Sequence, residues 1–230
     1  DKNLKKLFLA RDRIGVKPLY WCLNESFFFG SEIKALKKFI DFKNIIERKS
    51  FNFFLRFGYI NQPLSIYKDI YQVMPGEILE IDSNLNISKK KFFEHYENFA
   101  KDSSLDNFEN CLRNLENTIN LSVKKSLASD VEVGCFLSGG TDSSIISYYM
   151  SKNSLKKIKT FCLFSKEIMT DESLEAKNFS EFIGSDHYEI ELKKENIEEY
   201  FQNMHDIYDE PFADTSRIPT NLFQNLQNNM

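Results

Sequence analysis

In the second half of the chain, short apolar runs typical of strands alternate with amphipathic segments typical of helices. Strands are expected at 131–137, 158–164 and 188–192, and helices at 143–151, 172–183 and 196–208. A strand joined to the next through a helix normally runs parallel to it, because the helix returns the chain to the same edge of the sheet. The alternation therefore predicts an α/β fold, with a parallel sheet and helices on both faces.

The first part of the chain, up to about His95, has a different pattern of short apolar runs and turns. Strands are expected at 4–10, 19–23, 26–29, 67–73 and 77–82, with one helix at 50–57. Ser31 looks like the N-cap of a further short helix, and Asn196 like the N-cap of the last one. This part reads as a β-rich domain with few helices.

A polar break at 100–104 separates the two patterns. Beyond it, apolar residues recur every three or four positions from Leu105 to Leu127, which predicts a long amphipathic helix. We therefore expect two domains, 1–97 and 98–230.

Composition excludes several classes of protein. The 230 residues are 42% hydrophobic, which disfavours disorder, and the net charge of −4 provides no basic field for nucleic acid. No apolar run approaches the roughly 18 residues that cross a bilayer. The four cysteines form no CxxC pair, so a reducing, cytoplasmic setting is expected. The missing initiator Met and the uncapped helical pattern at 221–230 favour a fragment of a longer protein.

The sequence Ser-Gly-Gly-Thr-Asp-Ser-Ser at 138–144 lies between an expected strand and an expected helix. In a parallel sheet, ligands bind where strands end and the next helices begin. Gly139 and Gly140 allow close backbone approach, and the hydroxyl groups and free N–H groups there suit phosphate oxygens. A Gly-Gly turn capped by Ser or Asp is the structural alternative. There is no GxxxxGK[ST] pattern, so this is not a Walker A loop.

Asp142 is the unusual member of the loop, because a carboxylate would repel phosphate. Its presence is explained if Mg²⁺ lies between the two and takes oxygen ligands from both. The loop therefore predicts ATP and Mg²⁺ as ligands, with Asp142 as the metal ligand.

The 138–144 sequence resembles the SGGxDSS motif of the PP-loop ATP pyrophosphatases, a Rossmann-like fold. Three further blocks, at 11–20, 29–36 and 209–220, resemble asparagine synthetases, and they occur in that family's order. The first two look like the closing part of the family's glutaminase, a class II amidotransferase domain with an N-terminal nucleophile. The resemblance covers nearly the whole chain.

The resemblance implies a role for each matching residue. Six positions of the loop would hold ATP or pyrophosphate: Ser138, Gly139, Gly140, Asp142, Ser143 and Ser144. Leu137 and Leu163 would contact the nucleotide, and Arg217, helped by Thr215 and Ser216, would bind substrate or phosphate. For Arg217, the alternative is a surface arginine paired with a neighbouring acid.

The resemblance also implies a reaction. ATP would activate the side-chain carboxylate of aspartate as an adenylate, and ammonia released from glutamine would then attack it. Catalytic residues are not expected within the chain, since the glutaminase cysteine and the later synthetase residues would lie outside it, and the chain alone is expected to be inactive. The small-molecule partners are glutamine, aspartate and ATP. Nucleic acid and membrane are not expected, and a homodimer is left open.

Three other functions are alternatives to this interpretation. A related amidotransferase or cyclase could use the same adenylate chemistry on another carboxylate, such as a sugar acid or antibiotic precursor. A tRNA thiolase should show a basic surface and catalytic CxxC cysteines, and neither is present. A non-catalytic interaction module with a vestigial loop should not bind nucleotide at all.

Overall fold

The computed structural model describes residues 1–39, 42–94, 107–165, 172–214, 216–217 and 220. The chain forms two compact units. Unit 1 comprises Asp1–Lys101 together with Gln202–Arg217, and unit 2 comprises Asp102–Phe201 together with Ile218–Met230. The stretch 202–217 thus follows the last strand of unit 2 in sequence but clusters with unit 1.

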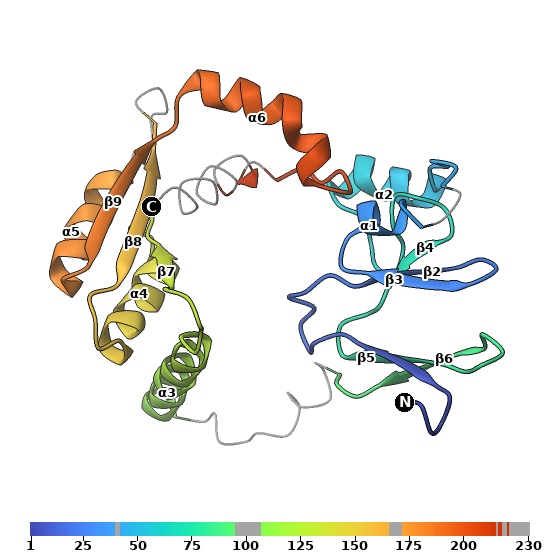
Figure 1. The fold of residues 1–230 in the computed structure, drawn as a ribbon. Coiled ribbons are helices and arrows are strands. Elements are labelled where there is room, and N and C mark those ends of the chain that lie inside the picture. Colours follow the sequence, from blue (N-terminus) through green and yellow to red (C-terminus); the bar gives the residue numbers. More distant parts are fainter. Residues whose placement is uncertain (40–41, 95–106, 166–171, 215, 218–219, 221–230) are drawn as a thin grey trace. The chain divides into compact units, whose positions relative to one another are not determined.

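Unit 1 contains two antiparallel sheets of three strands each (Figure 1). In the first sheet, β5 (Glu77–Ile81) lies between β1 (Leu7–Ala10) and β6 (Ile87–Lys91). In the second, β2 (Tyr20–Leu23) lies between β3 (Phe27–Gly30) and β4 (Ile70–Gln72). The β-rich character expected of this part is thereby confirmed, although β6 was not expected.

Alternation along β2 builds two cores, because successive side chains of a strand point to opposite faces. Trp21 packs between the two sheets, in a core whose other fully buried members are Leu9, Val73, Leu79 and Ile81. Tyr20 and Cys22 point to the other face, where they pack against α1 (Ile33–Leu36). The second helix, α2 (Arg48–Phe57), ends at Gly58 in the left-handed conformation.

The expected N-cap of α1 is wrong. Glu32, and not Ser31, occupies the N-cap position, and its side chain makes no capping hydrogen bond. The carboxylate of Asp209 accepts hydrogen bonds from the first N–H groups of the helix instead.

Unit 2 contains a parallel sheet in the order β7 (Gly134–Phe136), β8 (Lys159–Phe164), β9 (Asp186–Glu191), which confirms the predicted α/β alternation. The connecting helices are α4 (Thr141–Asn153) and α5 (Ser173–Ile183). They contact each other as well as the strands, so they cover the same face of the sheet. Helices were expected on both faces of the sheet. The described helices α4 and α5 cover one face, so the expectation is met on that face only.

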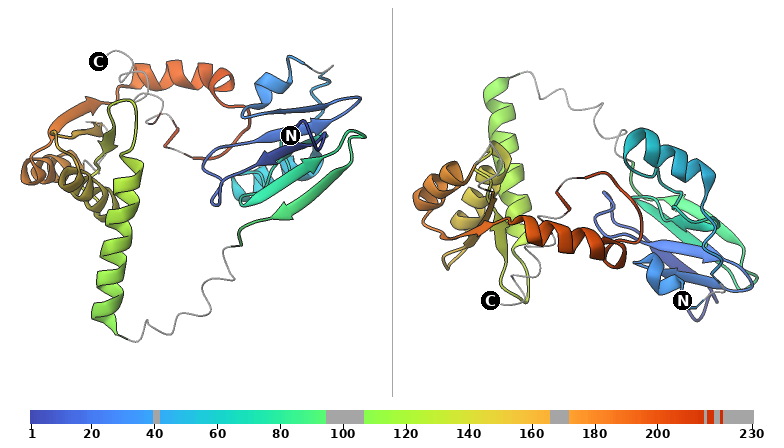
Figure 2. Two further views of the ribbon diagram at one scale, coloured as in Figure 1. Left: turned by 60° about the horizontal axis from the view of Figure 1, so that its bottom comes forward. Right: turned by 90° about the horizontal axis from the view of Figure 1, so that it is seen from above.

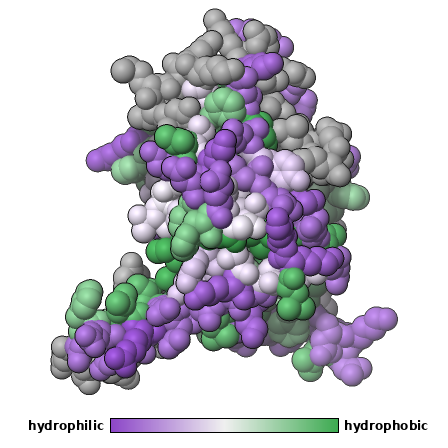
Figure 3. Space-filling model, turned by 90° about the vertical axis from the view of Figure 1, so that its left-hand side faces the viewer, coloured by the Kyte–Doolittle hydropathy of each residue, from purple (hydrophilic) through white to green (hydrophobic). Residues whose placement is uncertain are grey.

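The long helix α3 (Phe108–Ser126) lies alongside α4 (Figure 2). Val123 of α3, Cys135 of β7 and Met150 of α4 belong to one buried cluster, which packs the last turn of α4 against α3 and the sheet. On the side that carries α5, apolar side chains are interspersed among hydrophilic ones, as on an ordinary protein surface (Figure 3).

The last described helix, α6 (Lys194–Ile207), starts two residues before the expected N-cap, so the assignment of Asn196 to that position is wrong. The strand before the 138–144 loop is also shorter than expected, and the helix after the loop begins at Thr141 rather than Ser143. None of the helices in the described ranges combines the length and the apolar character needed to cross a bilayer.

Candidate functional site

The 138–144 loop lies where the sequence places it, between the end of β7 and the start of α4. The N–H group of Leu137 still donates to the carbonyl oxygen of Phe161, at 2.8 Å, so the parallel pairing continues to the last residue before the loop. Ser138 is the first residue to leave the sheet. The loop therefore occupies the carboxyl edge of a parallel sheet, the edge at which such sheets bind ligands.

Two serine side chains hold the loop in shape. The hydroxyl groups of Ser138 and Ser143 lie 3.1 Å apart, and the Ser143 oxygen also accepts from the N–H group of Ser138. Ser143 donates to the carbonyl oxygen of Gly140 at 3.1 Å. These bonds join the two ends of the loop.

Positions 139 and 140 are occupied by glycine for different structural reasons. Gly139 has a φ of +79°, and a Cβ there would lie 2.6 Å from the Cβ of Glu175 and 2.9 Å from the N atom of Ala176. The fold itself therefore excludes a side chain at Gly139. Gly140 has a φ of −69°, and a Cβ there would meet only the Ser138 hydroxyl, at 3.3 Å. The fold does not demand a glycine at 140, whereas a ligand approaching the backbone would.

The start of α4 offers donors to an anion. The first N–H groups of a helix have no partner within the helix, and the helix dipole favours negative charge at this end. Among the described residues, none accepts a hydrogen bond from the N–H groups of Gly139, Thr141 or Asp142. The Thr141 and Asp142 side chains are exposed. The loop thus presents several free donors beside one exposed carboxylate.

The side chains of the described residues do not form a complete metal-binding site by themselves. In the described part of the chain, no cluster of three or more His, Cys, Asp or Glu side chains is arranged to hold a metal ion. Asp142 by itself supplies one carboxylate. An Mg²⁺ ion at this position would have to take most of its oxygen ligands from phosphate and water, which is the usual pattern for Mg²⁺.

The two leucines that the resemblance singles out have different environments. Leu137 as a whole residue is 1% exposed, and it packs against Cys162 and Ala176. Its N–H group is bonded to Phe161, so Leu137 offers almost no surface to a ligand. Leu163 lies on β8 next to Cys162 and so points to the opposite face of the sheet, where it is partly exposed.

Arg217 belongs to unit 1, whereas the 138–144 loop belongs to unit 2. Its guanidinium carbon lies 4.2 Å from the ring centroid of Phe212 and 5.4 Å from that of Tyr208, and Tyr208 donates to its carbonyl oxygen. Its Nε atom is buried and has no hydrogen-bond partner among the described residues. Thr215 lies outside the described residues.

The environment of Arg217 differs from that of a surface arginine paired with an acid. In the described ranges it forms no ion pair, and it lines a pocket together with Lys34 and Lys37. The pKa of the neighbouring Asp214 is lowered mainly by hydrogen bonds from Ser216, with a smaller contribution from the charge of Arg217.

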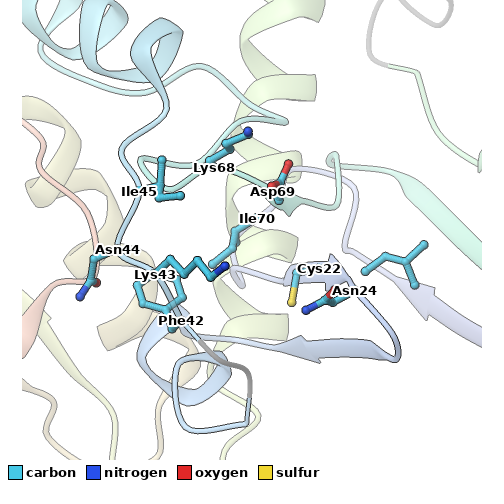
Figure 4. Close-up of a pocket in the computed structure, with 10 residues that line it drawn as sticks. Cys22, Asn24, Phe42, Lys43, Asn44, Ile45, Lys68, Asp69 and Ile70 are labelled. Carbon is cyan, nitrogen blue, oxygen red and sulfur yellow. The ribbon is translucent and has the colours of Figure 1, made fainter.

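A separate pocket of about 260 Å³ lies in unit 1, beside β2 (Figure 4). Lys43 reaches across it toward Cys22, whose thiol pKa is raised by burial. A thiol held protonated is a poor nucleophile. This pocket contains none of the residues that the sequence singled out.

Comparison with known proteins identifies the family. Residues 114–229 match the model of the asparagine synthase family, and residues 1–93 match that of the glutamine amidotransferase domain. The chain belongs to the asparagine synthase family. This confirms the resemblance on which the site residues were chosen.

Individual relatives agree with the family models. A putative glutamine-hydrolysing asparagine synthetase of Methanocaldococcus jannaschii is 32% identical over 225 residues, which is 96% of this chain and 43% of the relative. Asparagine synthetase 1 of Bacillus subtilis is 30% identical, over 95% of this chain and 34% of the relative. The human asparagine synthetase is 28% identical, over 85% and 34%. The chain therefore spans less than half the length of these relatives.

The structure also assigns contacts to two residues of the 209–220 block for which the sequence predicts no role, Asp209 and Glu210. Both carboxylates bind groups of unit 1 far away in sequence. The adjacent acids before a proline were the only local signal, and nothing local indicates their partners.

Proposed function

We propose that the chain is part of a glutamine-dependent asparagine synthetase, in which unit 2 supplies the pyrophosphate-binding half of the ligase site. The observation that carries this proposal is the 138–144 loop at the carboxyl edge of the parallel sheet, in a chain of the asparagine synthase family. We further propose that unit 2 has the PP-loop ATP pyrophosphatase fold and that the domains divide near 97, the first being the closing part of a glutaminase with an N-terminal nucleophile.

In the first step, a carboxylate oxygen of the aspartate side chain attacks the α-phosphorus of ATP. The bond between the α-phosphorus and the bridging oxygen breaks, and pyrophosphate leaves with that electron pair. We assign the loop the role of stabilising this leaving group, because the N–H groups of Gly139, Thr141 and Asp142 have no acceptor among the described residues and can donate to phosphate oxygens. Mg²⁺ held by Asp142 would neutralise further charge on the phosphate oxygens.

In the second step, the ammonia nitrogen attacks the acyl carbon of the adenylate, AMP leaves and a proton is lost, which gives asparagine. Glutamine hydrolysis supplies the ammonia. We propose that Arg217 binds phosphate or carboxylate oxygens during this sequence, since a guanidinium can donate two parallel hydrogen bonds to either group. Ser144 and Leu163 would contact the nucleotide or its phosphates, and Thr215 would contact the same substrate or phosphate group as Arg217.

Titration calorimetry tests the loop on this chain. Pyrophosphate with Mg²⁺ should bind the wild-type chain and should bind an Asp142→Ala variant at least about tenfold more weakly, since charged hydrogen-bonded or metal contacts are worth about 1.5–3 kcal/mol. Equal affinity for the two chains would remove Asp142 as a metal ligand. No binding to either would favour a vestigial loop.

The complete product of the gene tests the reaction. Incubated with ATP, Mg²⁺, aspartate and ammonium, it should form asparagine, AMP and pyrophosphate in equal amounts. Activity with another carboxylate and none with aspartate would instead favour a related amidotransferase or cyclase.

A further inference from the structure

Asp209 supplies the N-terminal cap that α1 lacks in its own sequence. Its two carboxylate oxygens accept from the N–H groups of Ile33, at 2.6 Å, and Lys34, at 3.0 Å. The N-cap residue Glu32 makes no side-chain cap. A carboxylate at this position satisfies two helix-end donors and interacts favourably with the helix dipole. The stretch after α6 is thereby bound to α1.

Glu210 is bound to the same unit by both of its carboxylate oxygens. One oxygen accepts from the N–H group of Ile66 at 2.6 Å, and the other accepts from the hydroxyl of Tyr20 at 2.7 Å. The amide of Gln72 adds a longer contact of 3.4 Å. Burial raises the pKa of Glu210, against the effect of its hydrogen bonds with Tyr20 and Ile66. A partly buried carboxylate of this kind is stable where hydrogen-bond donors replace the lost water.

The neighbouring backbone is attached at further points. The N–H group of Ala213 donates to the carbonyl oxygen of Gly58, at 2.6 Å, directly after α2. The ammonium group of Lys34 donates to the carbonyl oxygens of Asp206 and Ile207. The stretch 206–213 is therefore fastened to both helices of unit 1 and to β2.

Arg217 depends on this stretch for its place. The two rings that contact its guanidinium belong to Tyr208 and Phe212, which stand immediately before and shortly after the Asp209–Glu210 pair. Tyr208 also donates to the carbonyl oxygen of Arg217. A change that releases the acidic pair from unit 1 would free both rings and the guanidinium with them.

We propose that Asp209 and Glu210 are positioning residues for the ligase reaction: by binding α1, Tyr20 and Ile66 they fix the stretch that orients Arg217 toward substrate. The proposal rests on the proposed function, in which Arg217 binds phosphate or carboxylate oxygens.

The test compares variants of the complete gene product in ammonia-dependent asparagine synthesis. Glu210→Ala and Arg217→Ala should each lower kcat/KM by about tenfold to a hundredfold, since misplacing a positioned group by about 1 Å has that effect. The double variant should be within about twofold of Arg217→Ala alone, because residues that act through one group are not additive. A double variant whose loss is the product of the single losses would overturn the proposal.

Conservative and matched variants separate positioning from folding. Glu210→Gln should recover most of the activity, because its oxygen can accept from Ile66 while its amide donates to the Tyr20 oxygen. Asp206→Ala removes an exposed carboxylate of the same stretch and should change nothing. An effect of Asp206→Ala equal to that of Glu210→Ala would also overturn the proposal.

With each substitution made in the 230-residue chain, whose single tryptophan is Trp21, the fluorescence of Trp21 reports whether unit 1 is folded. If Glu210→Ala unfolds unit 1, the Tyr20→Phe variant, which removes one hydrogen-bond donor, takes its place in the double-variant comparison with Arg217→Ala. Additive losses there would contradict the proposal in the same way. If the wild-type protein makes no asparagine at all, the proposed function fails, and not the positioning role.

Discussion

Gly139 and Glu175 are in such close contact that a Cβ at Gly139 would lie 2.6 Å from the Cβ of Glu175. The loop before α4 is thereby pressed against the first turn of α5. The contact shows that the packing of the two crossover helices restricts the shape of the loop.

Gly139→Ala is therefore expected to destabilise unit 2. The left-handed conformation alone costs an alanine about 1–2 kcal/mol, and the contact with α5 adds to that cost. Chemical denaturation should show the loss as a lower unfolding midpoint. A variant as stable as the wild type would mean that the loop can move away from α5 at no cost.

Gly140→Ala is the matched variant with the opposite expectation. Its unfolding midpoint should be close to that of the wild type, because its φ of −69° suits alanine and only a hydroxyl lies nearby. Pyrophosphate affinity should nevertheless fall at least about tenfold, since a methyl group would occupy the space that a phosphate needs. Unchanged pyrophosphate affinity would mean that the ligand does not approach the backbone at this residue.

Asp142→Asn should separate metal binding from stability. The exposed carboxylate at the start of α4 stabilises the helix by about 0.3–1 kcal/mol through the dipole, so the variant should stay folded. The Mg²⁺ dependence of pyrophosphate binding should be lost. Glu181→Gln, which alters an exposed carboxylate of α5, is the control and should retain that dependence.

Glu210 should make the stability of unit 1 depend on pH. Burial raises its pKa above the usual value of 4.5, so the folded state binds the proton more tightly than the unfolded state does. The contribution of Glu210 is fully present below pH 4.5 and is lost as the pH rises through the raised pKa. The free energy of unfolding, followed by Trp21 fluorescence, should fall over that window in the wild type. The Glu210→Gln variant should lack this pH-dependent part of the free energy of unfolding. Identical pH profiles for the wild type and the variant would contradict the role assigned to Glu210.

Local sequence patterns were enough to predict the alternation of strands and helices in unit 2, because side-chain periodicity and the Ser-Gly-Gly turn are local signals. Strand β6 was not predicted because three of its five residues are Lys89, Lys90 and Lys91, which lie exposed on an edge strand. Only Ile87 marks its core-facing side.

Partners that are distant in sequence could not be predicted at all. Asp209 accepts a hydrogen bond from the N–H group of Ile33, which lies 176 positions away in the sequence. Glu210 accepts one from Ile66, which lies 144 positions away. Ser31 was chosen as the cap of α1 because it was the nearest suitable side chain. The structure shows that the cap comes from the other end of the chain instead.

The most direct measurement follows oxygen from substrate to product in the complete gene product. Aspartate labelled with ¹⁸O in its side-chain carboxylate is incubated with ATP, Mg²⁺ and ammonium, and the products are analysed by mass spectrometry. If the 138–144 loop binds pyrophosphate as the leaving group, one ¹⁸O should appear in AMP and none in pyrophosphate, and Gly140→Ala should suppress the transfer. Label in inorganic phosphate with formation of ADP, or transfer unaffected by Gly140→Ala, would contradict the role assigned to the loop.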